Sequence, residues 1–111
     1  MAITLKKLSQ NSLQASAVTQ YTVPAATTTR VTELLLTNYS TANEQEVTLH
    51  FVPAGGAASS GNKVLNKYVV PAMALVQFDL KSVLGTSDFI SALASSSTSI
   101  NLYISGGEIT T

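Results

Sequence analysis

An alternation of apolar and polar side chains with a period of two residues constrains this chain more than any other feature of its sequence. In the run 46–52 (EVTLHFV), the apolar side chains of Val47, Leu49 and Phe51 alternate with polar ones. A strand with one buried face has this pattern. Because similar runs recur along the chain between turn-like segments, we predict an all-β protein.

The segments between the alternating runs are rich in small and polar residues that favour turns. The predicted strands span residues 18–23, 30–37, 46–52, 63–70, 73–80, 88–94 and 99–105. Packing two layers is the simplest way to bury one face of each strand, so we predict one small β-sandwich or jelly-roll-like domain of about seven short antiparallel strands. The two lysines in 63–70 favour an edge strand. We also expect a helical turn over 81–85 and the end of the last strand at 106–107.

The length of 111 residues fits a single domain. Residues 1–17 are polar and irregular, so we expect an extended N-terminal arm ahead of a sandwich domain at 18–111. Three leucines in this arm, Leu5, Leu8 and Leu13, are its candidate anchors on a partner. The segment 54–62 consists of small and polar residues and is predicted to be an exposed loop.

Charged residues make up only 11% of the chain, against about 25% in typical soluble domains, and the net charge is zero. A neutral surface promotes association, so we predict that the protein is part of a larger assembly and forms a dimer or trimer. In 30–37, Leu35 lies on the same side as Glu33. It either packs under a loop or faces a partner subunit.

Several classes of protein are excluded or disfavoured by what the sequence lacks. There is no cysteine, which excludes disulfides and thiolate metal sites. No basic run marks a nucleic-acid surface, and no stretch approaches the ~20 apolar residues of a membrane helix. The N-terminus has no apolar core of the kind that signal peptides contain, so we expect synthesis in a cytoplasm and no export.

Residues that could carry chemistry are few. His50 is the only histidine, on the polar side of its strand, and we interpret it as a surface or interface residue. A small hydrolase would have to use Asp79 and Asp88, which we interpret as strand-end and turn residues. The Gly55-Gly56 pair is not followed by the Lys-Ser/Thr ending of a phosphate loop. We therefore predict no enzyme activity, cofactor or metal.

Tyrosines are the aromatic residues most suited to contact a binding partner. Tyr39 lies in a predicted turn, and Tyr103 lies on the polar side of the last strand. Exposed tyrosines anchor protein interfaces or stack on sugars. Because they do not cluster in the sequence, we favour the protein interface.

Three runs, 32–38 (TELLLTN), 47–56 (VTLHFVPAGG) and 101–106 (NLYISG), resemble a group of small tailed-phage virion proteins. The shared features are a strand that ends in a Leu-Thr-Asn turn, a Val-Pro-x-Gly-Gly strand end and a C-terminal Ile-Ser-Gly. The resemblance covers roughly residues 20–108. The chain departs from the group before the penultimate strand, where Gly-Asp is common and this sequence has GTSD at 85–88.

The resemblance implies a structural protein found in the virion and made in the host cytoplasm, with the major capsid protein or another virion protein as partner. We expect a capsid decoration (cement) protein that bridges capsomers as a homo-oligomer. The alternatives are a tail, neck or fibre-adapter subunit, or a carbohydrate-binding module. The candidate interface residues are Leu5, Leu8, Leu13, Leu35, Tyr39, His50, Gly55, Gly56 and Tyr103.

Overall fold

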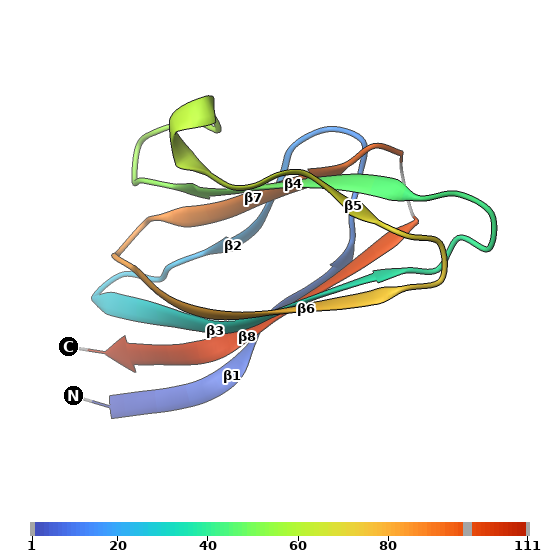
Figure 1. The fold of residues 1–111 in the computed structure, drawn as a ribbon. Coiled ribbons are helices and arrows are strands. Elements are labelled where there is room, and N and C mark those ends of the chain that lie inside the picture. The colour runs from blue at the N-terminus through green and yellow to red at the C-terminus, as the bar shows by residue number, and fades with distance from the viewer. Residues whose placement is uncertain (1, 97–98, 111) are drawn as a thin grey trace.

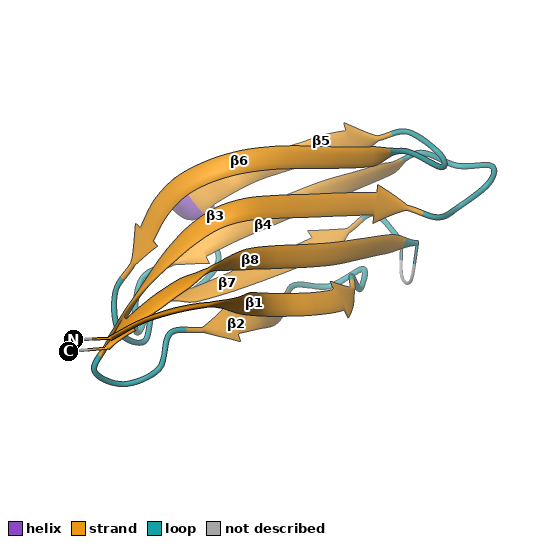
Figure 2. Ribbon diagram, turned by 90° about the horizontal axis from the view of Figure 1, so that it is seen from below, coloured by secondary structure: helices purple, strands orange, loops and turns teal. Residues whose placement is uncertain are grey.

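Two antiparallel four-stranded sheets pack face to face in this computed structural model, which describes residues 2–96 and 99–110 (Figures 1 and 2). Sheet A contains, in spatial order, β1 (Ala2–Ser12), β8 (Ile100–Thr110), β3 (Thr27–Asn38) and β6 (Leu75–Leu84). Sheet B contains β2 (Val18–Thr22), β7 (Phe89–Ala94), β4 (Gln45–Val52) and β5 (Lys63–Val70). A short 3-10 turn, η1 (Ser60–Asn62), precedes β5. The predicted β-sandwich is confirmed. Residues 97 and 98, in the predicted connection before the last strand, lie outside the described residues.

The alternation locates the strands well where one face is buried. The predicted strand 63–70 coincides with β5, and 46–52 differs from β4 by one residue. β5 is an edge strand of sheet B, as its two lysines predicted. In β8, Ile100, Leu102 and Ile104 point into the core, as their spacing predicted.

Residues 2–12, expected to form an arm ahead of the sandwich, instead form its edge strand β1. This strand pairs with β8 from Ala2 opposite Thr110 to Ser12 opposite Asn101. Leu8 is almost buried, and Leu13, just after the strand, is fully buried in the core. The partner of β1 is about 100 residues away in the chain, so local polarity could not reveal this pairing.

The predicted helical turn over 81–85 is wrong, because β6 continues to Leu84. Leu84 pairs with Thr29 of β3 and is buried. The expected strand end at 106–107 is also wrong, because β8 runs on to Thr110. Gly106 reflects a close approach of β8 to β3 and not a turn.

Two bulges flank Ser105 of β8 and shape sheet A. Leu8 is an extra residue of β1 and Thr32 an extra residue of β3, each inserted beside Ser105 in the register with β8. Val31 and Leu34 are three residues apart, so a strict alternation would place them on opposite faces. Both point into the core, because the bulge between them shifts the alternation by one residue. A strict alternation through Glu33 and Leu35 would instead predict that Val31 lies on the outer side.

The core draws apolar side chains from both sheets and from the N-terminal segment. Its fully buried members of largest volume are Leu13, Leu34, Leu36, Leu49, Ile90, Ile100, Leu102 and Ile104. On one open side of the sandwich, Tyr68 of β5 meets Phe78 of β6 in an edge-to-face contact, with ring centroids 5.1 Å apart. The whole molecule measures 47 × 26 × 19 Å. It is an elongated body with both termini at one end (Figure 1).

Candidate interaction surfaces

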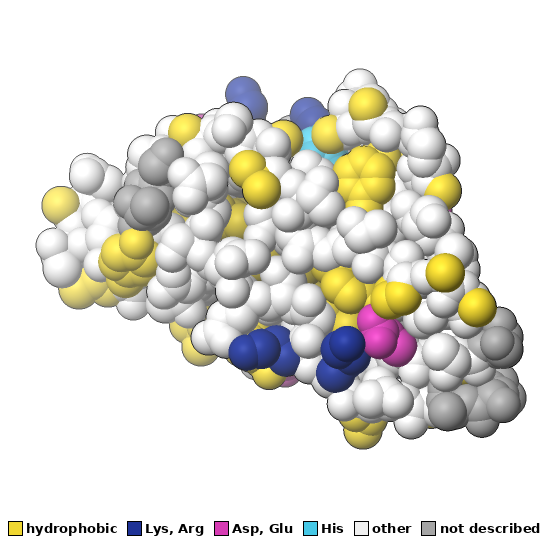
Figure 3. Space-filling view, turned by 180° about the vertical axis from the view of Figure 1, so that it is seen from behind, with side chains coloured by type: hydrophobic (Ala, Val, Ile, Leu, Met, Phe, Trp, Pro, Cys, Tyr) yellow, Lys and Arg dark blue, Asp and Glu magenta, His cyan; other side chains and the backbone are white. Residues whose placement is uncertain are grey.

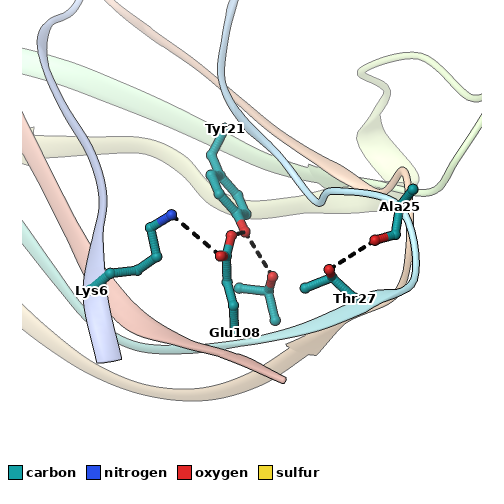
Figure 4. A network of polar contacts seen from close by, with 6 residues as sticks. Lys6, Tyr21, Ala25, Thr27 and Glu108 are labelled. Atoms are coloured by element: carbon teal, nitrogen blue, oxygen red, sulfur yellow. Dashed lines mark hydrogen bonds and ion pairs between the residues drawn. The ribbon is translucent and has the colours of Figure 1, made fainter. Parts of the chain in front are cut away.

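A polar cluster closes the other open side of the sandwich, near the termini (Figure 4). Tyr21 reaches from sheet B and donates its hydroxyl hydrogen to Glu108 of β8, and its oxygen lies 2.7 Å from Thr29 Oγ1. Lys6 of β1 forms an ion pair with Glu108, with Nζ and Oε1 3.2 Å apart. Figure 4 also shows Thr27, whose hydroxyl donates to the carbonyl of Ala25 at 3.0 Å.

The environment of this cluster perturbs two ionisable groups. Burial, with a further contribution from the hydrogen bond to Glu108, raises the pKa of Tyr21 to about 12. The hydrogen bond from Tyr21 lowers the pKa of Glu108, and Lys6 adds to this effect. The neutral phenol and the charged carboxylate therefore stabilise each other across the two sheets. We interpret the cluster as a structural contact that holds the two sheets together, since all its groups have partners within the fold.

Exposed apolar side chains gather on the outer face of sheet A near the termini. Leu5, Gly107, Arg30 and Val83 lie in one row across the four strands, and Ile3 lies beside Ile109 in the next row. Leu5 is 83% exposed, and Ile3 and Val83 are also largely exposed. Because Gly107 has no side chain, a shallow cavity of about 300 Å³ opens between Leu5 and Arg30. We call Ile3, Leu5, Val83 and Ile109 the terminal apolar patch.

A second group of exposed apolar side chains lies at the opposite end of the molecule. Tyr39 follows β3, and Met73 and Leu75 lie in the connection to β6 and at its start. Backbone hydrogen bonds from Met73 to Ser40 and from Asn38 to Ala74 hold these two segments together. Met73 is 70% exposed, and its neighbours Tyr39 and Leu75 are exposed as well. We call Tyr39, Met73 and Leu75 the loop-end apolar patch.

A hollow of about 560 Å³ lies on the outer face of sheet A, where β1, β8 and β3 run side by side. Leu35 and Tyr103 face each other in register on β3 and β8, and both are half-buried in its lining. Of the two alternatives for Leu35, the structure therefore places it at an open surface. Apart from Leu102, whose side chain is buried in the core, the other lining residues are polar and uncharged: Gln10, Asn11, Ser12, Thr37 and Asn101. The hollow lies toward the loop end of the sheet, where Thr37 pairs with Leu75 of the loop-end apolar patch. We call it the sheet A hollow.

Three of the predicted interface residues are not available at the surface. Leu8 and Leu13 belong to the core. His50 is only 5% exposed, although it lies on the predicted polar side of β4. The segment before β5 folds back, and Asn62 places its Oδ1 2.8 Å from His50 Nδ1. The imidazole is thus held inside the monomer.

The segment 54–62 is exposed, as predicted, and its internal hydrogen bonds hold a defined turn. Gly55 adopts a positive φ of 77°, a conformation that glycine reaches without steric strain. The amide of Gly56 donates to the carbonyl of Pro53 at 2.9 Å. Asn62 accepts from the amide of Ser59 and donates to the carbonyl of Ala57. These contacts explain Gly55 and Gly56 as turn residues.

The carboxylates of the hydrolase alternative hold separate structural positions. Asp88 accepts from the backbone amides of Ala54 and Gly85, at 2.9 and 2.8 Å, and so ties two loops together. Asp79 lies on β6 opposite Glu33, and Gln77 donates to both of these carboxylates. Within residues 2–96 and 99–110, no group of three histidine or acidic side chains could hold a metal ion. No helix in this part of the chain is long and apolar enough to span a membrane.

The surface is weakly charged in the folded protein as well. Most of the face seen in Figure 3 carries neither hydrophobic nor charged side chains, and the few charged groups lie at its upper edge and in its lower part. Among the described residues, the structure contains a single ion pair, between Lys6 and Glu108. Long-range charge repulsion between copies is therefore weak.

Comparison with known proteins finds similarity in fold alone. No family model and no curated protein sequence matches the chain. A solved chain from the study "Bacillus endospore appendages form a novel family of disulfide-linked pili" is 14% identical with a TM-score of 0.58, and the match covers 97% of this chain and 88% of that chain. A chain from "Structure of infectious bursal disease virus Gx strain" is also 14% identical, with a TM-score of 0.52 over 96% of this chain and 31% of that one. Both belong to large assemblies, a pilus and a virus. Since this chain has no cysteine, it cannot form disulfide links between subunits.

Proposed function

We propose that this chain is a structural protein of a virus particle and that it decorates the capsid of a tailed phage by bridging neighbouring capsomers. The observation that carries the proposal is the presence of two exposed apolar patches at opposite ends of an elongated, weakly charged sandwich. A protein that bridges two neighbours needs two separate contact surfaces. Exposed apolar patches of this kind mark protein interaction sites.

The fold likenesses support this class of role, because the pilus chain and the virus chain both come from multi-copy assemblies. The proposal includes no catalytic activity. Each carboxylate of the pair considered for a hydrolase, Asp79 and Asp88, takes part in hydrogen bonds that organise strands and loops.

The positions of the two patches also favour a second candidate, a tail, neck or fibre-adapter subunit. If the terminal patch of one copy contacted the loop-end patch of the next, the contact would be heterologous. Heterologous contacts build a ring when the rotation closes and a filament when it does not.

Particles purified on a density gradient from the source of this sequence provide the first test. An antibody raised against the recombinant protein should detect the chain in the particle fraction, and immunogold labelling should place it on the head. Label at the neck or tail would favour the adapter. The proposal would be refuted if the chain is abundant in the lysate but absent from purified particles.

Variants of the two patches provide the second test. Leu5→Glu and Met73→Glu each place a charge in one patch, and burying an unpaired charge at an interface strongly opposes association. We expect each variant to weaken incorporation into particles by at least about tenfold, which corresponds to ~1.4 kcal/mol. Val64→Glu is the matched control, since Val64 is an exposed apolar residue of β5 outside both patches. Equal incorporation of all three variants would exclude the patches as contact surfaces.

A further inference from the structure

We propose that the sheet A hollow binds a neutral oligosaccharide, a function that goes beyond the proposed assembly role. The hollow is formed by three adjacent strands, β1, β8 and β3, and has a volume of about 560 Å³. Binding sites for small ligands typically occupy ~300–1,000 Å³. A hollow that opens on the outer face of a sheet suits one stretch of an extended chain molecule.

Tyr103 supplies the aromatic surface that such a ligand requires. A sugar ring has an apolar face of C–H groups and a rim of hydroxyls, and a tyrosine ring offers a flat apolar face with a polar tip. Tyr103 lies directly opposite Leu35 in the register of β3 and β8. Because both side chains are half-buried, the protein supports one side of the Tyr103 ring, and a ligand in the hollow can contact the part that is exposed.

Two amide side chains on the same face as Tyr103, those of Gln10 and Asn101, are held in place by hydrogen bonds within the protein. Ser12 donates to Asn101 Oδ1 at 2.7 Å, and Lys7 donates to Gln10 Oε1 at 2.9 Å. The third amide of this segment, Asn11, is in register with the core residue Leu102 and donates to Gln20 Oε1 of sheet B at 3.2 Å, so its side chain points away from the hollow. Each amide group has two N–H donors and an oxygen that accepts, so one internal bond leaves further capacity for a ligand. Sugar hydroxyls both donate and accept, and they match such amides.

The chemistry of the lining favours a neutral ligand. All residues that line the hollow are uncharged, and the ammonium group of Lys7 at its rim is bonded to Gln10 Oε1. The lining itself therefore offers no charged side chain to an acidic sugar. The lining also differs from the two apolar patches, where exposed aliphatic side chains dominate and suit a protein partner. Polar amides around one tyrosine favour a carbohydrate over a second protein.

A printed array of neutral and acidic glycans, probed with the intact labelled protein, tests this proposal. Positive neutral glycans are then titrated into the protein, with cellohexaose, maltohexaose and triacetylchitotriose as additional probes, and binding is followed by NMR and calorimetry. We expect at least one neutral class to bind. Tyr103→Ala and Gln10→Ala should each weaken its binding by roughly tenfold. Gln10 lies on an exposed edge strand, so its variant remains informative if Tyr103→Ala fails to fold.

Tyr39→Ala is the matched control, because it removes an exposed tyrosine outside the hollow. Its binding should stay within about twofold of wild type. The proposal is overturned if no neutral glycan binds, if only acidic glycans bind, or if Tyr39→Ala alone abolishes binding. A blank array together with loss of particle incorporation in Tyr103→Ala would instead identify the hollow as a protein contact. None of these results depends on the Leu5 and Met73 variants, so the two proposals can fail separately.

Discussion

Gly106 permits the close approach of β8 and β3 at the bulge of sheet A, and its replacement tests how this sheet is built. A Cβ atom added there would lie 2.0 Å from the carbonyl oxygen of Arg30 and 3.2 Å from a methyl carbon of Leu8. The Arg30 oxygen belongs to the backbone of β3, so it can yield only if the two strands separate. We expect Gly106→Ala to lower the free energy of unfolding by about 2–4 kcal/mol. Of this, ~1–3 kcal/mol comes from overpacking and ~1 kcal/mol from a weakened ladder hydrogen bond.

Gly107→Ala is the matched control for this prediction. Its added Cβ would lie 3.5 Å from Leu5 and 3.6 Å from the carbonyl oxygen of Thr4, which are ordinary contacts. We expect a change within about 1 kcal/mol. Urea unfolding followed by circular dichroism measures both values, and Gly106→Ala should also lower the melting temperature by roughly 10–20 °C. Equal stability of the two variants would show that β8 and β3 do not approach each other in this way.

Two further predictions concern the polar cluster and the first strand. Because the pKa of Tyr21 is raised from 10.0 to about 12, the unfolded chain loses this proton first, so stability should fall between pH 10 and 12. Urea unfolding across this range should show no such contribution in Tyr21→Phe. The lowered pKa of Glu108 acts in the opposite sense. The charged carboxylate stabilises the fold above the pKa that Glu108 has in the unfolded chain, and this stabilisation is lost as the pH falls through its pKa in the folded protein. Glu108→Gln should remove this dependence on pH. Leu13→Ala should lower the free energy of unfolding by about 2–5 kcal/mol, whereas exposed Leu5→Ala should change it by no more than ~0.5 kcal/mol. Equal effects of the two leucine variants on thermal unfolding would contradict the placement of Leu13 in the core.

Strands with a strict two-residue alternation could be predicted from the sequence, because one apolar face per strand is what the sandwich buries. The burial of Ile100, Leu102 and Ile104 follows from this pattern alone. In β6, Val76, Phe78 and Leu80 alternate with more exposed residues and pack against the core. Bulges could not be predicted, since Thr32 is an extra residue only relative to its partner strand β8.

The exposure of the candidate interface residues could likewise be predicted only in part from the sequence. Leu5, Leu35, Tyr39 and Tyr103 all reach the surface. The burial of His50 depends on Asn62 folding back from a later segment, and no local pattern encodes that contact. The terminal apolar patch joins residues from β1, β6 and β8, so only the strand order of sheet A brings them together.

The edges of the two sheets narrow the ways in which copies of this chain can contact each other. A weakly charged protein has little charge repulsion to prevent association through unpaired strand edges. In β5, Lys63 and Lys67 occupy the edge, and Lys67, with a positive φ of 50°, lies where the register with β4 shifts. β1 carries Lys6 and Lys7 next to the bulge at Leu8, and β2 is only five residues long and has its own register shift. Three of the four edges therefore resist backbone pairing. At these three edges, contacts through the side chains of the apolar patches are favoured over sheet extension, which leaves the edge strand β6 as the one place where strands of two copies could pair.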